Sequence, residues 1–420
     1  MLLSNENFSP GGKNWLLKYL ELVDKGIIIL ETTDKNDYSE SFLEVCINKT
    51  GLLFGACSSL IYGSSIDKNQ FTKDENLKLL LFETLIFTYK KEKNNFDKNL
   101  FLENLESFYQ DIKLSQFTHW SNFFAEEKTE SKIERILNDR VKVKTNFFGT
   151  NYWLNHLSNS FVFLDVLLFQ KFLRNEINSF FEIYEETAFT VIKALTYTAY
   201  LDKQVEEKEQ RMLWHFLSCA DLEKEQKEFC EQAILNGIEF EAVQLEKMND
   251  QVLKKIVFEL SIFVTKGTHI TSGKEEKKII DFGNKIGLTE KEIQLSFVLC
   301  NSYLLENNEE IALLNAESNT QFVYKAFSKR WFKILGRNKD KLVKELKESK
   351  ELVSLIQKST KEELTKEEKE QVKKQFLDVL KSMPSMAIFL LPGGALLLPL
   401  ILKIVPDLLP SAFKENDLEK

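Results

Sequence analysis

The chain has 420 residues, of which 43% are hydrophobic and 29% are charged, and its formal net charge is −8. This composition excludes an intrinsically disordered protein, and the length predicts two or three domains of about 150 residues each. Glycine (15 residues) and proline (6 residues) are too scarce for the frequent tight turns of a sandwich or barrel, so we predict an all-α fold.

Basic charge and proline are concentrated near the end of the chain. Residues 321–420 carry 20 Lys and Arg against 14 Asp and Glu, whereas residues 1–320 carry 36 against 50. All prolines except Pro10 lie from Pro384 onward. We therefore predict an N-terminal helical region at 1–150, a helical domain at 151–320 and a chemically distinct region at 321–420.

An uncharged stretch from Thr50 to Ile66 stands out in the N-terminal region. It contains Gly51 and Gly55 in the spacing that membrane helices use for close packing, and its length is near the lower limit for a membrane span. Several serines dilute its hydrophobicity, so we interpret it as a buried core helix.

A strongly apolar helix is predicted from Tyr152 to Phe172, with Asp165 in its second half. A buried carboxylate is costly unless it is paired or hydrogen-bonded. Asp165 is therefore either a ligand or proton site or, as we favour, an acceptor that other core groups satisfy.

Two segments of the middle region look like a loose internal duplication. Each has an apolar helix, a short polar turn, a charged run and an amphipathic helix, and the two copies span Ile192–Leu217 and Ile256–Gly283. A further helix is predicted to begin after Leu288, because Thr289 and Glu292 form the T-x-x-E pattern of a capping box.

This helix–acidic turn–helix pattern resembles the TerB-like (tellurite-resistance) all-helical fold. The resemblance implies an acidic metal-binding turn, for which the first copy offers Asp202, Glu206 and Glu207. The second copy has Gly267 where the first has Asp202. A solvated acidic turn is the alternative that we favour, and we expect no cofactor.

The segment from Lys325 to Lys350 is markedly basic. Such a segment before an apolar tail suits an anionic surface, either lipid headgroups or RNA, and a solvated helix face is the alternative. We expect no DNA partner. The basic residues that would form this surface are Lys329, Arg330, Lys333, Arg337, Lys341 and Lys344.

The C-terminal region combines capping boxes with a hydrophobic segment at 382–413. Thr360 to Glu363 and Thr365 to Glu368 both read T-x-x-E, and the 21 residues from Ser382 to Leu402 carry no charge. That length is sufficient for a helix to span the membrane, while a re-entrant element and a buried hairpin are alternatives. Prolines and glycines interrupt the segment at Pro384, Pro392, Gly393, Gly394, Pro399, Pro406 and Pro410.

The end of the chain resembles the LETM family of leucine-zipper/EF-hand-containing transmembrane proteins. The matching elements are Leu364-Thr-x-x-Glu368, Asp378-Val-Leu-Lys381, Pro384, Pro392, Pro399, Lys403, Pro406 and Leu408-Leu-Pro-Ser-Ala-Phe413. The resemblance implies a membrane-associated protein in ion homeostasis or in envelope or biofilm organisation, the latter by analogy with a bacterial branch of the family. Self-association through the hydrophobic segment is a further expectation.

Two departures from the family pattern bear on activity. Family members that act as cation/proton exchangers carry a glutamate where this chain has Ala395, three residues after Pro392. The family's ribosome-binding helical domain follows the LPS-x-F motif, and only seven residues follow Phe413 here. Cation/proton exchange is therefore only an alternative, and ribosome binding through that domain is not supported. A ribosome- or protein-binding adaptor that uses the basic 325–350 segment is another alternative.

We expect no enzymatic activity, because the sequence shows neither a P-loop nor a G-x-S-x-G motif, and no Glu-x-x-His pair. A nucleophilic Cys–His pair stays open, since neighbours in space are not visible in a sequence. The N-terminus lacks a basic stretch followed by an apolar one, so we expect no signal peptide, and we expect the bulk of the chain in the cytoplasm.

Overall fold

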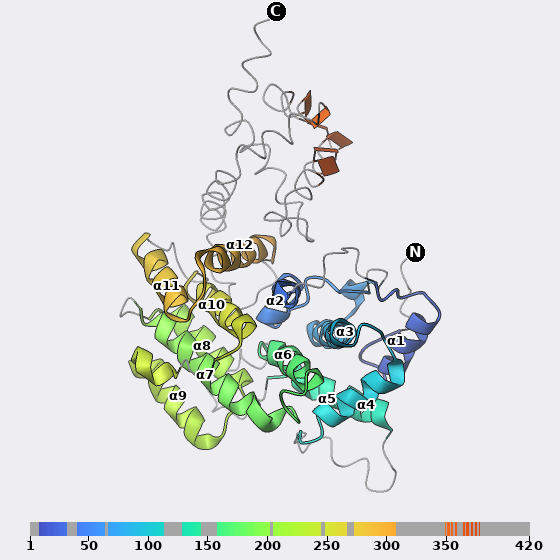
Figure 1. The fold of residues 1–420 in the computed structure, drawn as a ribbon, viewed down its shortest axis with the longest axis horizontal. Coiled ribbons are helices and arrows are strands. Elements are labelled where there is room, and N and C mark those ends of the chain that lie inside the picture. Colours follow the sequence, from blue (N-terminus) through green and yellow to red (C-terminus); the bar gives the residue numbers. More distant parts are fainter. Residues whose placement is uncertain are drawn as a thin grey trace, which may run out of the picture. The chain divides into compact units, whose positions relative to one another are not determined.

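The computed structural model describes residues 8–31, 40–63, 66–112, 128–143, 158–201, 205–244, 248–266 and 273–307, with a few residues between 349 and 378. The described residues form helices and no strand, which confirms the all-α prediction (Figure 1). The helices are α1 (Trp15–Asp24), α2 (Glu40–Lys49), α3 (Lys73–Lys93), α4 (Lys98–Phe108), α5 (Thr129–Arg140), α6 (Val162–Leu173), α7 (Phe181–Ala199), α8 (Glu207–Cys219), α9 (Lys224–Asn236), α10 (Gln251–Lys266), α11 (Gly273–Lys285) and α12 (Glu290–Asn307).

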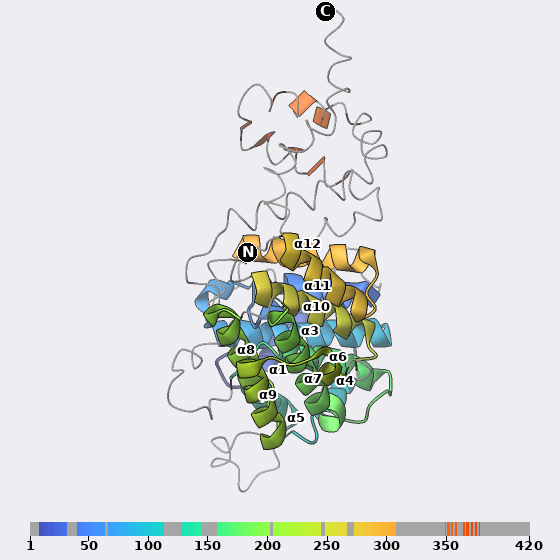
Figure 2. The same ribbon diagram turned by 90° about the vertical axis from the view of Figure 1, so that its left-hand side faces the viewer.

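The chain divides into two compact units. The first comprises residues 1–300 with 309–318, and the second comprises residues 301–308 with 319–420. In the first unit, α3 packs against α5 and α6, while α7 packs against α8, α9 and α10. Figure 2 shows α10 and α11 next to the first part of α12.

Side-chain caps fix where several helices begin. At the start of α12, the Glu292 N–H donates to Thr289 Oγ1 at 3.3 Å, and the Thr289 N–H donates to Glu292 Oε2 at 2.8 Å, so the predicted capping box is confirmed. In the second unit, Thr365 and Glu368 form the same pair of bonds, at 2.9 and 3.2 Å. The predicted box at Thr360–Glu363 lies outside the described residues.

The helices of the internal duplication are also confirmed. Its first copy corresponds to α7 and α8 and its second copy to α10 and α11, and the first helices of the two copies, α7 and α10, pack against each other. The duplicated elements are thus neighbours in the first unit.

The prediction of a helix from Thr50 to Ile66 is wrong. The described part of this stretch contains a single 3-10 turn, Leu52–Phe54, followed by irregular backbone. Gly51 (φ 89°) and Gly55 (φ 63°) flank the turn in the left-handed region, which is unfavourable for an α-helix. The predicted burial of this stretch is nevertheless confirmed, because the residues of the turn and Tyr62 lie in the core.

Glu83, in the middle of α3, holds this irregular stretch in place. Its side chain is fully buried and accepts the backbone N–H groups of Ile61 (2.6 Å) and Tyr62 (2.8 Å) and the hydroxyl of Tyr19 (2.8 Å). Burial raises the pKa of Glu83 to about 7, although these hydrogen bonds oppose the shift. The bonds replace those that a helix would have formed within its own backbone.

A second buried carboxylate connects four helical segments. Asp165 of α6 accepts two hydrogen bonds from Arg140 of α5, at 2.7 and 2.8 Å, and one from the Tyr109 hydroxyl after α4, at 2.8 Å. The Arg140 guanidinium also lies 4.7 Å from the ring centroid of Phe180 and 5.0 Å from that of Tyr184, beside and within α7. Asp165 is therefore a satisfied structural acceptor, as we favoured.

The helix around Asp165 is shorter than predicted. It begins at Val162 rather than Tyr152, and residues 158–161 precede it in non-helical conformations. The Asn159 side chain holds these residues in place just before α6. It accepts the Phe161 N–H at 2.8 Å and donates to the Arg140 carbonyl at 2.7 Å. Asp165 consequently lies in the first turn of α6.

Replacing Asp165 should destabilise the first unit strongly. D165N leaves the Arg140 guanidinium buried without a carboxylate, and the loss of one partner of a buried pair costs about 3–5 kcal/mol. Urea unfolding followed by circular dichroism measures this loss, with D111N as the control because Asp111 is exposed. Equal unfolding midpoints for the two variants would contradict the role assigned to Asp165.

Glu83 should make stability depend on pH near neutrality. Its pKa is about 7 in the folded chain against an ordinary 4.5, so the folded state binds the proton more tightly. This contribution is present at low pH and is lost as pH rises through about 7, with an upper limit of about 3 kcal/mol. E83Q, whose side chain is neutral at every pH, should lose less stability than wild type between about pH 5 and about pH 8 in thermal melts. An identical pH profile for both proteins would contradict the assignment.

Candidate functional site: a buried acidic cluster

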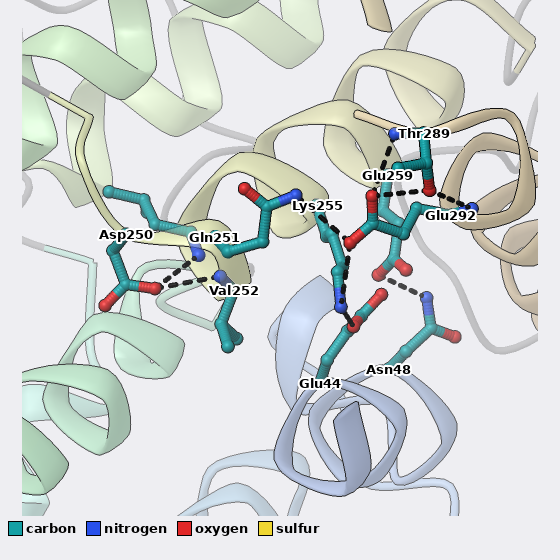
Figure 3. A network of polar contacts seen from close by, with 10 residues as sticks. Glu44, Asn48, Asp250, Gln251, Val252, Lys255, Glu259, Thr289 and Glu292 are labelled. Atoms are coloured by element: carbon teal, nitrogen blue, oxygen red, sulfur yellow. Dashed lines mark hydrogen bonds and ion pairs between the residues drawn. The ribbon is translucent and has the colours of Figure 1, made fainter. Parts of the chain in front are cut away.

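Side chains from α2, α10 and the start of α12 converge on a polar cluster in the first unit, and all of them except Glu292 are buried (Figure 3). Glu44 and Asn48 come from α2, Lys255 and Glu259 from α10, and Glu292 from the first turn of α12. Glu44, Asn48 and Glu259 are completely buried, and Lys255 is 8% exposed. We name these five residues the acidic cluster.

Lys255 lies between two carboxylates. Its Nζ donates to Glu44 Oε2 at 3.0 Å and lies 3.6 Å from Glu292 Oε1. On the other side of the cluster, Asn48 Nδ2 donates to Glu259 Oε2 at 3.0 Å. The carboxyl groups of Glu44 and Glu259 are close enough for each to shift the pKa of the other. The cluster therefore joins α2 to α10 and α10 to α12.

Burial controls the protonation of the two innermost carboxyl groups. It raises the pKa of Glu259 well above the ordinary value, and the nearby Glu44 carboxylate adds to the shift. Burial also raises the pKa of Glu44, although Lys255 opposes it. Removal from water thus shifts both groups toward their protonated forms, and Lys255 limits the shift of Glu44.

The outer members of the cluster stay charged. Burial works against ionisation of both Lys255 and Glu292, but their partners outweigh it. The carboxylates of Glu44 and Glu292 raise the pKa of Lys255, while the Thr289 N–H, Gln251 and Lys255 lower the pKa of Glu292. The arrangement can therefore hold charge and protons in a region shielded from solvent.

A Cys–His contact also exists, but it is not an activated nucleophile. Cys219 Sγ lies 3.7 Å from His215 Nε2, which is 2.8 Å from Ser160 Oγ, and all three side chains are buried. Burial lowers the pKa of His215 to about 3 and raises that of Cys219 to about 12. A neutral imidazole beside a protonated thiol fits a core contact, because thiol reactivity requires the thiolate.

The metal-binding turn implied by the TerB-like resemblance finds no support among the residues described. Glu206 caps α8, its N–H donating to Glu209 Oε2 at 3.0 Å, and Glu207 forms an ion pair with Arg211. Asp202 lies outside the described residues. Within the described part of the chain, no group of three or more His, Cys, Asp or Glu side chains could hold a metal ion.

The other predicted sites fall outside the described residues. These are the basic surface (Lys329, Arg330, Lys333, Arg337, Lys341 and Lys344) and the hydrophobic segment with Pro384, Pro392, Gly393, Gly394, Pro399, Lys403, Pro406 and Pro410. Among the helices that the structure describes, none combines the length and hydrophobicity that a membrane crossing requires.

The acidic cluster was not predicted from the sequence, although the sequence contains one signal for it. Glu259 is the only charged residue between Ile256 and Val264, just as Asp165 is the only one between Phe161 and Phe169. A lone carboxylate within an apolar run predicts a buried group that needs a partner. The partners of Glu259 on α2, Glu44 and Asn48, are about 200 positions away in the sequence and carry no pattern of their own.

Comparison with known proteins adds information on the second unit. A protein-family model described as "LETM1-like, RBD" matches residues 364–420. Residues 364–420 are similar to the LETM1-like family. This LETM1-like region agrees with the resemblance drawn from the capping box and the proline array, and it covers less than half of the chain. No curated protein and no solved structure matches.

Lys255 should be required for the stability of the acidic cluster. K255M removes the only cation in the cluster and leaves Glu44 buried beside Glu259, which should cost about 3–5 kcal/mol in the free energy of unfolding. K291M is the control, since Lys291 is an exposed lysine on α12. Urea unfolding of the two variants compares them directly, and a K255M midpoint equal to that of K291M would be inconsistent with this role.

Proposed function

We propose that this chain is a non-enzymatic, LETM-like membrane-associated protein that acts in ion homeostasis or in envelope or biofilm organisation. The match of residues 364–420 to the LETM1-like family carries the proposal. The physical character of the hydrophobic segment supports it, because 21 uncharged residues in a row suit a hydrocarbon layer of about 30 Å.

The charges around the segment support one orientation. Lys373, Lys374 and Lys381 precede it, whereas Glu415, Asp417 and Glu419 follow it. Lysines near a membrane segment favour the cytoplasmic side, so the helical body would lie in the cytoplasm. If the segment spans the membrane, the short tail would lie on the opposite, non-cytoplasmic side.

Cation/proton exchange is the weaker form of the proposal. Exchange that is coupled to protons requires an ionisable group within the membrane, and the segment from Ser382 to Leu402 contains none, with Ala395 after the central Pro-Gly-Gly. Similarity of the middle region to the TerB-like fold stays part of the proposal. It rests on the helix pairs α7–α8 and α10–α11.

Membrane fractionation tests the proposal directly. The full chain should remain in the membrane pellet after a high-salt wash, and deletion of 382–413 should transfer it to the soluble fraction. A matched variant replaces Lys329, Arg330, Lys333, Arg337, Lys341 and Lys344 by glutamine and keeps the hydrophobic segment. It should stay in the pellet, because insertion of an apolar segment does not depend on salt-screened charge. A full chain that is soluble and unaffected by the deletion would refute the proposal.

The same variants test a second candidate, an adaptor that binds ribosomal RNA or a protein partner. The excess of basic residues between Lys325 and Lys350 favours it. Binding to RNA phosphates would give co-sedimentation with ribosomes that weakens steeply with salt and is lost in the glutamine variant. Absence of co-sedimentation at low salt would exclude it.

A further inference from the structure

The acidic cluster contains two carboxyl oxygens for which the described residues provide no hydrogen-bond donor. They are Glu44 Oε1 and Glu259 Oε1, each on a side chain with no solvent exposure. The second oxygen of each carboxyl group is satisfied, by Lys255 and by Asn48 respectively. Buried oxygens without donors are rare, so two of them on carboxyl groups in mutual contact require an explanation.

The charge of the cluster also indicates that a proton is missing from these contacts. If Glu44 and Glu259 were both ionised, Lys255 would neutralise one of them and the other would be an uncompensated buried charge. Glu292 cannot help, because it is itself an anion and is occupied by the Thr289 N–H and Gln251. A single proton placed between the two carboxyl groups supplies the missing donor and removes the excess charge.

The hydrogen bonds indicate which group carries the proton. Glu44 accepts from the Lys255 ammonium at 3.0 Å, an interaction that favours its ionised form. Glu259 has only neutral donors beside it, the amide of Asn48 at 3.0 Å and the hydroxyl of Ser296. These contacts favour Glu259 as the carboxylic acid, with its O–H directed to Glu44.

We propose that Glu44 and Glu259 form a buried binding site for one proton, carried by Glu259, which joins α2 to α10. The inference does not depend on the membrane proposal, because every residue involved belongs to the first unit. The charged and titratable groups around the pair are Lys255 on α10 and Glu292 and Cys300 on α12. The Cys300 thiol donates to the Glu259 carbonyl at 3.4 Å.

Loss of this proton would weaken the contact between α2 and α10. Two buried carboxylates repel each other, and the contact between α2 and α10 would change from a hydrogen bond to a repulsion. The raised pKa of Glu259 means that the folded state binds the proton more tightly than the unfolded state. The resulting stability is present at low pH and is lost as pH rises through the folded pKa.

Infrared spectroscopy of the full chain tests the proposal. A protonated carboxylic acid has a carbonyl stretch that is separate from the bands of carboxylates and amides. At about pH 8, ordinary glutamates are ionised and Glu83 is mostly ionised. Wild type should therefore show this band, E259Q should lose it, and E103Q should keep it because Glu103 is exposed.

Two features keep the test decisive. Glutamine at position 259 can still donate to Glu44 and accept from Asn48, so E259Q should retain the wild-type helical circular dichroism. If E259Q fails to fold, E44Q provides the second measurement, because the band should persist but shift when the acceptor changes from a carboxylate to an amide. Absence of the band in wild type would overturn the proposal, as would an unchanged band in E259Q or in E44Q.

Discussion

The ion pair between Arg140 and Asp165 is the interaction on which the first unit depends most. It is completely buried, and its partners come from α5, α6, the end of α4 and the start of α7. An apolar contact would tolerate a shift of neighbouring helices, but two parallel hydrogen bonds of 2.7 and 2.8 Å fix both distance and direction. The surrounding aromatic core, with Phe108, Tyr109 and Phe180 in mutual contact, is packed around this fixed point.

Glu83 and the acidic cluster meet the same requirement by different means. Glu83 is held by backbone N–H groups of an irregular segment and by a tyrosine hydroxyl. Glu44 is paired with Lys255, and Glu259 is neutralised by a proton in our proposal. In each case the hydrogen-bond partner of the carboxyl group lies on a different segment of the chain. The need to pair these buried groups therefore helps to determine which segments pack together.

The sequence predicted features whose causes are local. The capping boxes at Thr289 and Thr365 depend on residues three apart, and both exist in the structure. The unusual burial of Asp165 followed from the apolar residues around it. The irregular path of residues 50–63 did not, because it depends on Glu83, which lies on another helix. The acidic cluster likewise combines residues that are about 200 positions apart, and only the tertiary structure brings them together.

The position of Arg140 at the end of α5 has a consequence for how such a sequence can diverge. Either member of the pair is unfavourable in the core without the other, so a change at position 140 or 165 is expected to be accompanied by a change at the other position. Surface positions on α9, where Phe229 and Leu235 are already exposed, carry no such link. We therefore expect paired changes at buried polar positions such as 140 and 165 to be a better mark of distant relatives of the first unit than overall sequence similarity.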